Sequence, residues 1–174
     1  EVFENSVNMM KNNLKLKKAV ADSVCMQKVY LEADDIAIPE NRNLNCKTVI
    51  SKERSFEAAS KYVREGKKVC VLNFASATNP GGGVTRGSTA QEECLCRCST
   101  LYPCLNSEKM RMLFYEPHRK TENPLYNADC IYTPDVTVFK TDTSVPEKMD
   151  EKDWYQVDIL TCAAPNLRRK PSNS

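Results

Sequence analysis

The glycines of this chain are concentrated in one segment, and this constrains the fold more than any other feature. Four of the five glycines lie in residues 77–93, ATNPGGGVTRGSTAQEE. The preceding run KVCVLNFAS (68–76) is typical of a strand that is buried on both faces of a sheet. A helix should follow, starting near Ser88 or Thr89 and ending near Ser99. A strand, a glycine-rich loop and a helix in this order indicate an α/β fold with a ligand site at the carboxyl end of the strand.

The remaining segments alternate between helical and strand-like patterns. In ERSFEAASKYVREGKK (53–68), apolar residues recur at helical spacing, and Gly66 is placed to end that helix. Weaker patterns predict a short surface helix in 1–18, a helix in 107–118, strands in 26–34, 45–53 and 154–166, an extended pair broken at Pro134 in 129–140, and a charged loop in 144–153. This order of elements predicts an α/β sandwich with a mainly parallel sheet.

Composition narrows the class of protein. With 25 Lys and Arg against 23 Asp and Glu, the net charge of +2 gives no strong electrostatic case for binding nucleic acid or a membrane, and we expect neither DNA nor a membrane as a partner. The sequence has no run of about 18 apolar residues, so no transmembrane helix is expected. A single histidine excludes a His-rich zinc site.

The nine cysteines indicate a reducing environment. An odd number scattered through apolar segments is typical of free thiols, so we expect a cytoplasmic protein. Cys70 and Cys162 lie in strand-like runs and should be small buried residues. Cys94, Cys96 and Cys98 form C-x-C-x-C, whereas zinc sites usually have CxxC pairs or nearby histidine. We therefore expect buried structural thiols and no metal, with a thiol or metal protein as the alternative.

Three consecutive glycines, Gly81, Gly82 and Gly83, are the first candidate for a ligand site. The bare backbone can approach a ligand closely and turn N–H groups inward as an anion nest, and the next helix offers its positive end. This combination suits a diphosphate; the alternative is a flexible loop. The segment is neither a Walker loop nor G-x-G-x-x-G, which disfavours phosphoryl transfer and dinucleotide redox chemistry.

Two adjacent glutamates at the start of the expected helix are the second candidate. Thr89-x-x-Glu92 fits a capping box, as does Ser88-x-x-Gln91, so Glu92 also has a purely structural interpretation. Glu93 lies outside that pattern and is a candidate for acid–base cleavage of a glycosidic bond. Desolvation or a neighbouring carboxylate would raise such a pKa and the helix dipole would lower it, and the sequence leaves this balance open.

Asn79 is the third candidate, with Asn73 as the other polar residue of this region. Asn79 precedes Pro80, which favours an extended backbone. Its amide suits ribose hydroxyls, but an Asn-Pro pair also forms turns, and both interpretations stay open.

The pattern GGG, seven residues and QEE resembles the signature of the poly(ADP-ribose) glycohydrolases (PARG). The flanking NFASATNPGGGV and QEECLCRCSTLYPCL, with IYTPDVTVF (131–139) and VDILTCAAPN (157–166), are similar to the microbial-type branch of that family. The resemblance covers about residues 45–166. It implies a macrodomain-like α/β/α sandwich with a mixed, mainly parallel sheet, in which 1–44 form an N-terminal helical and strand extension and 45–174 the first part of the catalytic domain.

The same resemblance implies an activity and the residues that perform it. The activity is hydrolysis of the ribose–ribose O-glycosidic bond of poly(ADP-ribose) to release ADP-ribose, with no metal or cofactor. Glu93 matches the catalytic acid, which protonates the departing ribose oxygen and then helps to deprotonate water at an oxocarbenium-like centre. Glu92 matches a glutamate that holds ribose hydroxyls, and Asn79 an asparagine that contacts the terminal ribose. The other expected substrate-binding residues are Gly81, Gly82, Gly83, Val84 and Gln91.

The chain departs from this family in one respect. Family members continue past the AAPN segment and carry a second Gly-rich phosphate loop, whereas Gly87 is the last glycine here. We therefore expect a fragment, a domain completed by a second polypeptide, or a shortened homologue. Its sheet would expose an edge and an apolar surface. The alternative to an enzyme is a non-catalytic module that binds ADP-ribose.

Overall fold

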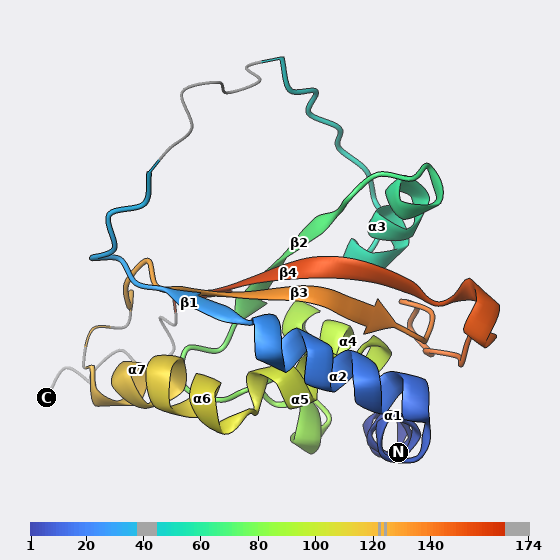
Figure 1. The fold of residues 1–174 in the computed structure, drawn as a ribbon, viewed down its shortest axis with the longest axis horizontal. Coiled ribbons are helices and arrows are strands. Elements are labelled where there is room, and N and C mark those ends of the chain that lie inside the picture. The colour runs from blue at the N-terminus through green and yellow to red at the C-terminus, as the bar shows by residue number, and fades with distance from the viewer. Residues whose placement is uncertain (38–44, 122, 124, 166–174) are drawn as a thin grey trace, which may run out of the picture.

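The computed structural model describes residues 1–37, 45–121, 123 and 125–165 of the 174-residue chain. The strands are β1 (Lys28–Tyr30), β2 (Cys70–Ala75), β3 (Cys130–Val138) and β4 (Tyr155–Ala163). The helices are α1 (Val2–Asn12), α2 (Leu14–Met26), α3 (Ser55–Arg64), α4 (Gln91–Cys98), α5 (Leu101–Leu105), α6 (Glu108–Met110) and α7 (Glu116–Lys120), with 3-10 turns at Val84–Arg86 and Glu151–Asp153. The sheet order is β1-β3-β4-β2, and α1, α2 and α4–α7 lie together on one side of it (Figure 1).

The N-terminal segment forms two helices where one short surface helix was predicted. Asn13 separates them, and its side-chain oxygen caps α2 by accepting hydrogen bonds from the N–H groups of Lys15 (2.9 Å) and Leu16 (3.1 Å). Leu16 is fully buried and packs with Met10 and Phe139. Because β1 also pairs with β3, this segment is part of the same core and sheet as the rest of the chain.

The strand predicted for residues 45–53 is wrong. Thr48, Val49 and Ile50 form no strand, and Ile50 is 94% exposed. β-Branched residues favour a strand only where a partner and a packing surface exist. No strand of the described sheet pairs with this segment.

The helix predicted for 53–68 forms as α3, and glycine ends it as expected. The N–H of Gly66 donates to the Val63 carbonyl (2.9 Å), and φ of Gly66 is +74°. The N–H of Lys67 donates to the Tyr62 carbonyl (3.0 Å). These two hydrogen bonds form a Schellman motif, which satisfies the last carbonyl groups of the helix.

The strand before the glycine loop is buried on one face only, which corrects the prediction of burial on both. Along β2, Val71, Asn73 and Ala75 are buried, whereas Leu72 is 42% and Phe74 60% exposed. β2 lies at the edge of the sheet, and α4 packs against it. The described residues leave the other face of the strand open.

That open face of the sheet is largely apolar. Besides Leu72 and Phe74, it carries the exposed Cys70, and the half-buried Cys130 and Cys162 lie directly opposite each other on β3 and β4. The prediction that Cys70 and Cys162 are buried is therefore wrong. The exposed apolar surface expected for a partly covered sheet is confirmed.

The sheet is mixed, which confirms the predicted α/β class. Among the described strands, however, only β2 and β4 are parallel, and β3 is antiparallel to both β4 and β1. "Mainly parallel" is therefore wrong for this part of the chain. The described helices supply one layer, with α3 near the start of β2, rather than the two full layers of a sandwich (Figure 1).

β3 is one strand with a bulge, where an extended pair with a break was predicted. The register shifts between Thr133 and Val136, and Asp135 takes a positive φ of +53°. On β4, the carboxylate of Asp158 accepts hydrogen bonds from the Asp135 N–H (3.2 Å) and the Tyr132 hydroxyl (2.6 Å). Asp158 of β4 therefore holds the bulge of β3 in place.

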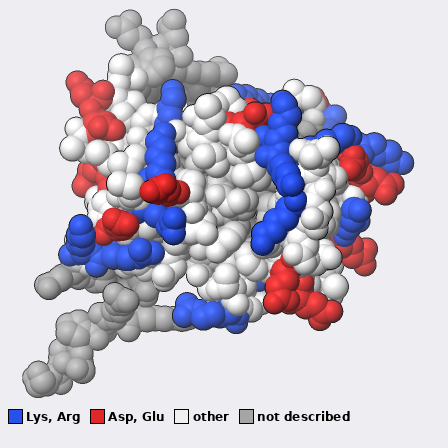
Figure 2. All heavy atoms as spheres, turned by 60° about the horizontal axis from the view of Figure 1, so that its bottom comes forward, with Lys and Arg blue, Asp and Glu red and all other residues white. Residues whose placement is uncertain are grey.

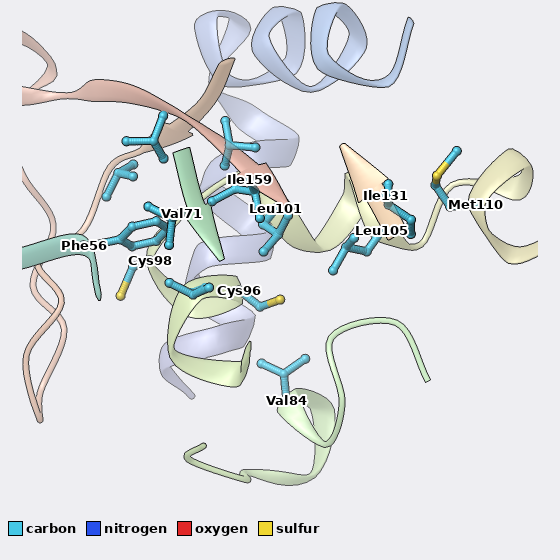
Figure 3. Packing of buried hydrophobic residues seen from close by; sticks show 14 of the residues in the cluster. Phe56, Val71, Val84, Cys96, Cys98, Leu101, Leu105, Met110, Ile131 and Ile159 are labelled. Atoms are coloured by element: carbon cyan, nitrogen blue, oxygen red, sulfur yellow. The ribbon is translucent and has the colours of Figure 1, made fainter. Parts of the chain in front are cut away.

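The helix predicted for 107–118 forms as α6 and α7, joined by a π-helical stretch at Arg111–Tyr115. α5 was not predicted separately, and 144–153 is the expected loop apart from its 3-10 turn. The helices pack through a main apolar cluster, in which Phe56 of α3 lies beside Val71 and Cys98 (Figure 3), and a second apolar cluster formed by Met10, Leu16 and Phe139. Leu101 and Leu105 of α5 are fully buried in the main cluster.

The helical side of the molecule carries charges of both signs. In Figure 2, basic and acidic side chains are interspersed around an uncharged centre. In the part of the chain that the structure describes, every helix is too short or too polar to cross a bilayer.

Candidate active site

Helix α4 starts later than predicted, and no capping box forms. Its N-cap is Ala90, whose side chain makes no cap hydrogen bond. Gln91 instead reaches the edge strand β2, where Oε1 accepts from the Phe74 N–H (2.9 Å) and Nε2 donates to the Leu72 carbonyl (2.7 Å). The Gln91 amide thus takes the place of a neighbouring strand and anchors the start of the helix at the end of β2.

Glu92 is buried beside the carboxyl end of β2, with 3% of its surface exposed. Its Oε2 accepts a hydrogen bond from the Ser76 N–H (2.8 Å), and its Oε1 has no partner among the described residues. Burial raises the pKa of Glu92 to about 7; the Ser76 N–H and the Asn73 side chain lower it, and Glu93 raises it further. At Glu92, desolvation therefore outweighs the hydrogen bonds that lower the pKa.

Glu93 lies against the glycine loop and is 7% exposed. Its Oε1 accepts a hydrogen bond from the Gly83 N–H (2.8 Å). Its Oε2 is buried and has no hydrogen-bond partner in the described part of the chain. The carboxyl group is therefore turned toward the bend, as an acid that acts beside the loop requires.

The anion nest predicted for the loop is not free. Three of its N–H groups donate within the chain: Gly82 to the Asn79 carbonyl (2.9 Å), Gly83 to Glu93 Oε1 (2.8 Å) and Val84 to the Gly81 carbonyl (3.1 Å). The loop thus holds the protein's own carboxylate, and the Gly83 N–H could reach a ligand anion only in place of Glu93. The bond to Asn79 also forms the turn that was the alternative interpretation of that residue.

Glycine is required at two positions of the loop by both backbone and space. φ is +68° at Gly81 and +59° at Gly82, values that L side chains rarely adopt. A Cβ atom on Gly82 would overlap Oε1 of Glu93 and lie 2.9 Å from Oε2 of Glu92. The loop backbone and the two carboxyl groups are therefore in direct contact.

A cavity of about 220 Å³ opens beside these groups. Glu92, Glu93 and Gly82 line it, together with Phe74, Ala75, Ser76, Ala77, Thr78, Ala90, Tyr126, Ala164 and Pro165. Sequence reasoning missed Tyr126, which takes a positive φ of +58° in a segment with no recognisable pattern. The predicted site residues outside this lining are Asn79, Gly81, Gly83, Val84 and Gln91.

The exposed Asn79 is close to the cavity without lining it. Its Nδ2 donates to Thr78 Oγ1 (3.2 Å), and its N–H donates to Ser76 Oγ (3.2 Å). Ser76 therefore shapes the start of the loop through its hydroxyl and holds Glu92 through its N–H.

Other parts of the described chain offer less chemistry. A larger cleft of about 740 Å³ between α1, α2 and α5 has no carboxyl or thiol group in its lining. No cluster of three or more His, Cys, Asp or Glu among the described residues could hold a metal ion. In the C-x-C-x-C motif, Cys96 and Cys98 are buried as predicted, and Cys94 is half-buried.

The comparison with protein families decides the relationship. Residues 4–141 match the model of the microbial-type PARG catalytic domain. This chain belongs to that family. The matched region runs from α1 to just beyond β3 and includes the glycine loop, Glu92 and Glu93. No curated protein matches the chain.

Solved PARG structures are similar to this chain. PARG from Thermomonospora curvata has a TM-score of 0.78 at 29% identity, over 99% of this chain and 66% of that chain. The same enzyme bound to the inhibitor ADP-HPD has a TM-score of 0.72 at 29% identity, over 96% of this chain and 63% of that chain. PARG from Deinococcus radiodurans in complex with ADP-ribose has a TM-score of 0.67 at 29% identity, over 84% of this chain and 58% of that chain. The chain thus spans less than two thirds of the length of these PARG chains.

Proposed function

We propose that this chain carries the catalytic residues of a poly(ADP-ribose) glycohydrolase, which hydrolyses the ribose–ribose O-glycosidic bond and releases ADP-ribose. Membership of the PARG family supports the reaction, and the ADP-ribose and ADP-HPD complexes of similar structures support the ligand. The observation that carries the proposal is the placement of two buried carboxyl groups against the glycine loop, at one cavity.

Glu93 acts as the general acid and base in this proposal. The Gly83 N–H holds Oε1 and leaves the unpartnered Oε2 to carry the proton. That proton goes to the departing ribose oxygen as the glycosidic bond breaks and the anomeric carbon gains oxocarbenium character. The Glu93 carboxylate then takes a proton from the water that adds to this carbon.

Glu92 assists through its own protonation. Its pKa of about 7 keeps it mostly neutral below that pH, so it can donate a hydrogen bond to a ribose hydroxyl. Because the pKa is raised, the proton is present below about 7 and lost above it. We expect activity to fall on the alkaline side, and a rate that stays constant well above neutrality would argue against this arrangement.

The substrate would extend beyond the cavity. A volume of about 220 Å³ is small for a whole ligand site, since such pockets usually have roughly 300–1,000 Å³. We place a ribose in the cavity, the pyrophosphate along the backbone of Gly81–Val84, and the terminal ribose near Asn79. The amide of Gln91 is engaged with β2, so Gln91 would position α4 rather than bind substrate.

All nine cysteines are free, which supports a reducing compartment, and on this basis we propose a cytoplasmic location. The similar structures give no support to a second polypeptide that completes the domain.

A non-catalytic ADP-ribose-binding module is the second candidate. The hydrogen bond from Gly83 favours it, because this bond gives the Glu93 carboxylate a structural role that needs no reaction.

The deciding experiment measures release of ADP-ribose from polymer and binding of ADP-ribose by calorimetry. Wild type is compared with Glu93→Gln and with Glu108→Gln, a control at an exposed position of α6. If the chain is an enzyme, Glu93→Gln should bind ADP-ribose but release none from the polymer, whereas the control should do both. Binding without release by the wild type would identify the module, and equal release by wild type and Glu93→Gln would refute the acid role of Glu93.

A further inference from the structure

The glycine loop contacts two helices. Gly82 contacts the carboxyl groups of α4. Gly81 lies against the ring of Tyr102 on α5, because a Cβ atom added to Gly81 would lie 2.7 Å from Cδ2 and 3.2 Å from Cε2 of that ring. Tyr102 therefore limits how far the loop can move away from Glu93.

Tyr102 is itself supported by the first turn of the chain. The ring of Phe3 on α1 meets the Tyr102 ring edge to face, with centroids 4.9 Å apart and an interplanar angle of 85°. Both residues are half-buried and pack against the main apolar cluster. Edge-to-face pairs of this kind contribute about 0.5–1.5 kcal/mol beyond the area that they bury.

α1 is fixed firmly enough to act as a support. The hydroxyl of the fully buried Ser6 donates to the Arg97 carbonyl at the end of α4 (2.6 Å). The ammonium group of the buried Lys140 donates to the Val2 carbonyl (3.1 Å). The helix that carries Phe3 is thus tied to the helix that carries the two glutamates.

The support from Phe3 matters because Tyr102 also borders open space. The cleft of about 740 Å³ between α1, α2 and α5 includes Tyr102 and Pro103 in its lining. A ring that borders a cleft of this size can rotate away from Gly81 unless another group holds it. Among the described residues, Phe3 is the aromatic partner that does so.

We propose that Tyr102 and Phe3 are positioning residues, which press the Gly81–Gly82 bend against Glu92 and Glu93. The inference deepens the proposed function, since it names the groups that set the distance between the ligand loop and the acid. In this proposal α1 stabilises the site through Phe3, although α1 contributes no residue to the cavity beside Glu93.

The first test measures the loop without any ligand. Amide hydrogen exchange is followed by mass spectrometry in peptides that cover residues 77–90 and, as an internal reference, β4. Tyr102→Ala and Phe3→Ala should speed exchange at Gly82 and Gly83 by about tenfold, the loss of roughly 1.4 kcal/mol, and leave β4 unchanged. Tyr102→Phe, which keeps the ring, should restore the wild-type rates.

The matched control is Trp154→Leu, which breaks the aromatic pair Phe139–Trp154 (centroids 6.2 Å apart) in the second apolar cluster. It should leave the 77–90 peptides protected. Faster hydrogen exchange in β4 as well as in the loop would show general destabilisation and overturn the proposal. The proposal would also be overturned if the Tyr102→Ala substitution left the exchange rates of the loop unchanged.

The second test separates this inference from the proposed function. ADP-ribose binding by calorimetry should weaken about tenfold in Tyr102→Ala and Phe3→Ala and stay within about twofold of wild type in Tyr102→Phe. If the wild type binds no ADP-ribose while the exchange result holds, the proposed function fails and the positioning role stands. If the wild type binds and both alanine variants bind equally well with an unchanged loop, the positioning role fails.

Discussion

Replacing Glu92 by glutamine should remove a pH dependence from the stability of the fold. The pKa of Glu92 is raised from 4.5 to about 7, chiefly by burial. The folded state therefore binds this proton more tightly than the unfolded chain does. The stabilisation is fully present below about pH 4.5 and is lost as the pH rises through about 7.

The size of the effect follows from the two pKa values. One pKa unit corresponds to about 1.4 kcal/mol, so the rise from 4.5 to about 7 corresponds to about 3 kcal/mol in the free energy of unfolding. Between about pH 5 and about pH 8, most of it, roughly 2–3 kcal/mol, should be lost by the wild type. Glutamine has nearly the same shape, stays neutral and can still accept from the Ser76 N–H, so Glu92→Gln should lack this loss.

Urea unfolding, followed by the fluorescence of the single tryptophan Trp154, measures this difference at the two pH values. Glu108→Gln, at an exposed position of α6, is the control and should behave as the wild type. Titration of all other groups is common to the three proteins and cancels in the comparison. If Glu92→Gln loses as much stability as the wild type over the same range, burial of this carboxyl is not what the structure indicates.

Three further predictions test particular contacts. Gly82→Ala should lose far more stability than Gly87→Ala, because both glycines have a positive φ (+59° and +83°) but only Gly82 lies against the carboxyl groups. Gly87→Ala should cost about 1 kcal/mol, and equal shifts in thermal unfolding for the two variants would contradict the overlap at Gly82. Gln91→Leu should cost about 1 kcal/mol and raise hydrogen exchange in β2 selectively, and unchanged protection of β2 would show that the amide does not pair with the strand. Oxidised glutathione should link Cys130 to Cys162 with release of two molecules of reduced glutathione, since these residues are opposite in the register; peptide mapping against Cys130→Ser checks this, and a missing link would mean a different register.

The segment that carries the site was predictable because its determinants are local. An apolar run, a glycine loop and a helix follow one another within residues 68–99, and each is recognised from its own composition. Gly66 likewise ends α3 through a motif that involves only neighbouring residues.

The details that depend on distant partners were not predictable. Ser88 and Thr89 matched capping boxes, but the side chains of Gln91 and Glu92 bond to β2 and Ser76, so the helix starts at Gln91. The glycine N–H groups looked available to an anion, but Glu93 from the next helix occupies one of them. In both cases a contact from another element replaced the local one.

Strand predictions failed where burial or pairing depends on the rest of the sheet. The β-branched run at 48–50 is exposed and unpaired in the described structure, and β2 proved to be an edge strand with one open face. Periodicity in one segment does not reveal how many neighbours a strand has.

Phe74 belongs to two surfaces at once. Its side chain is 60% exposed on the uncovered side of the sheet, and it also forms part of the rim around the two carboxyl groups. Any layer that shields this phenylalanine from water would therefore also border the cavity that Glu92 and Glu93 line. Covering this apolar face and narrowing the entrance to the cavity would consequently be coupled through one aromatic ring.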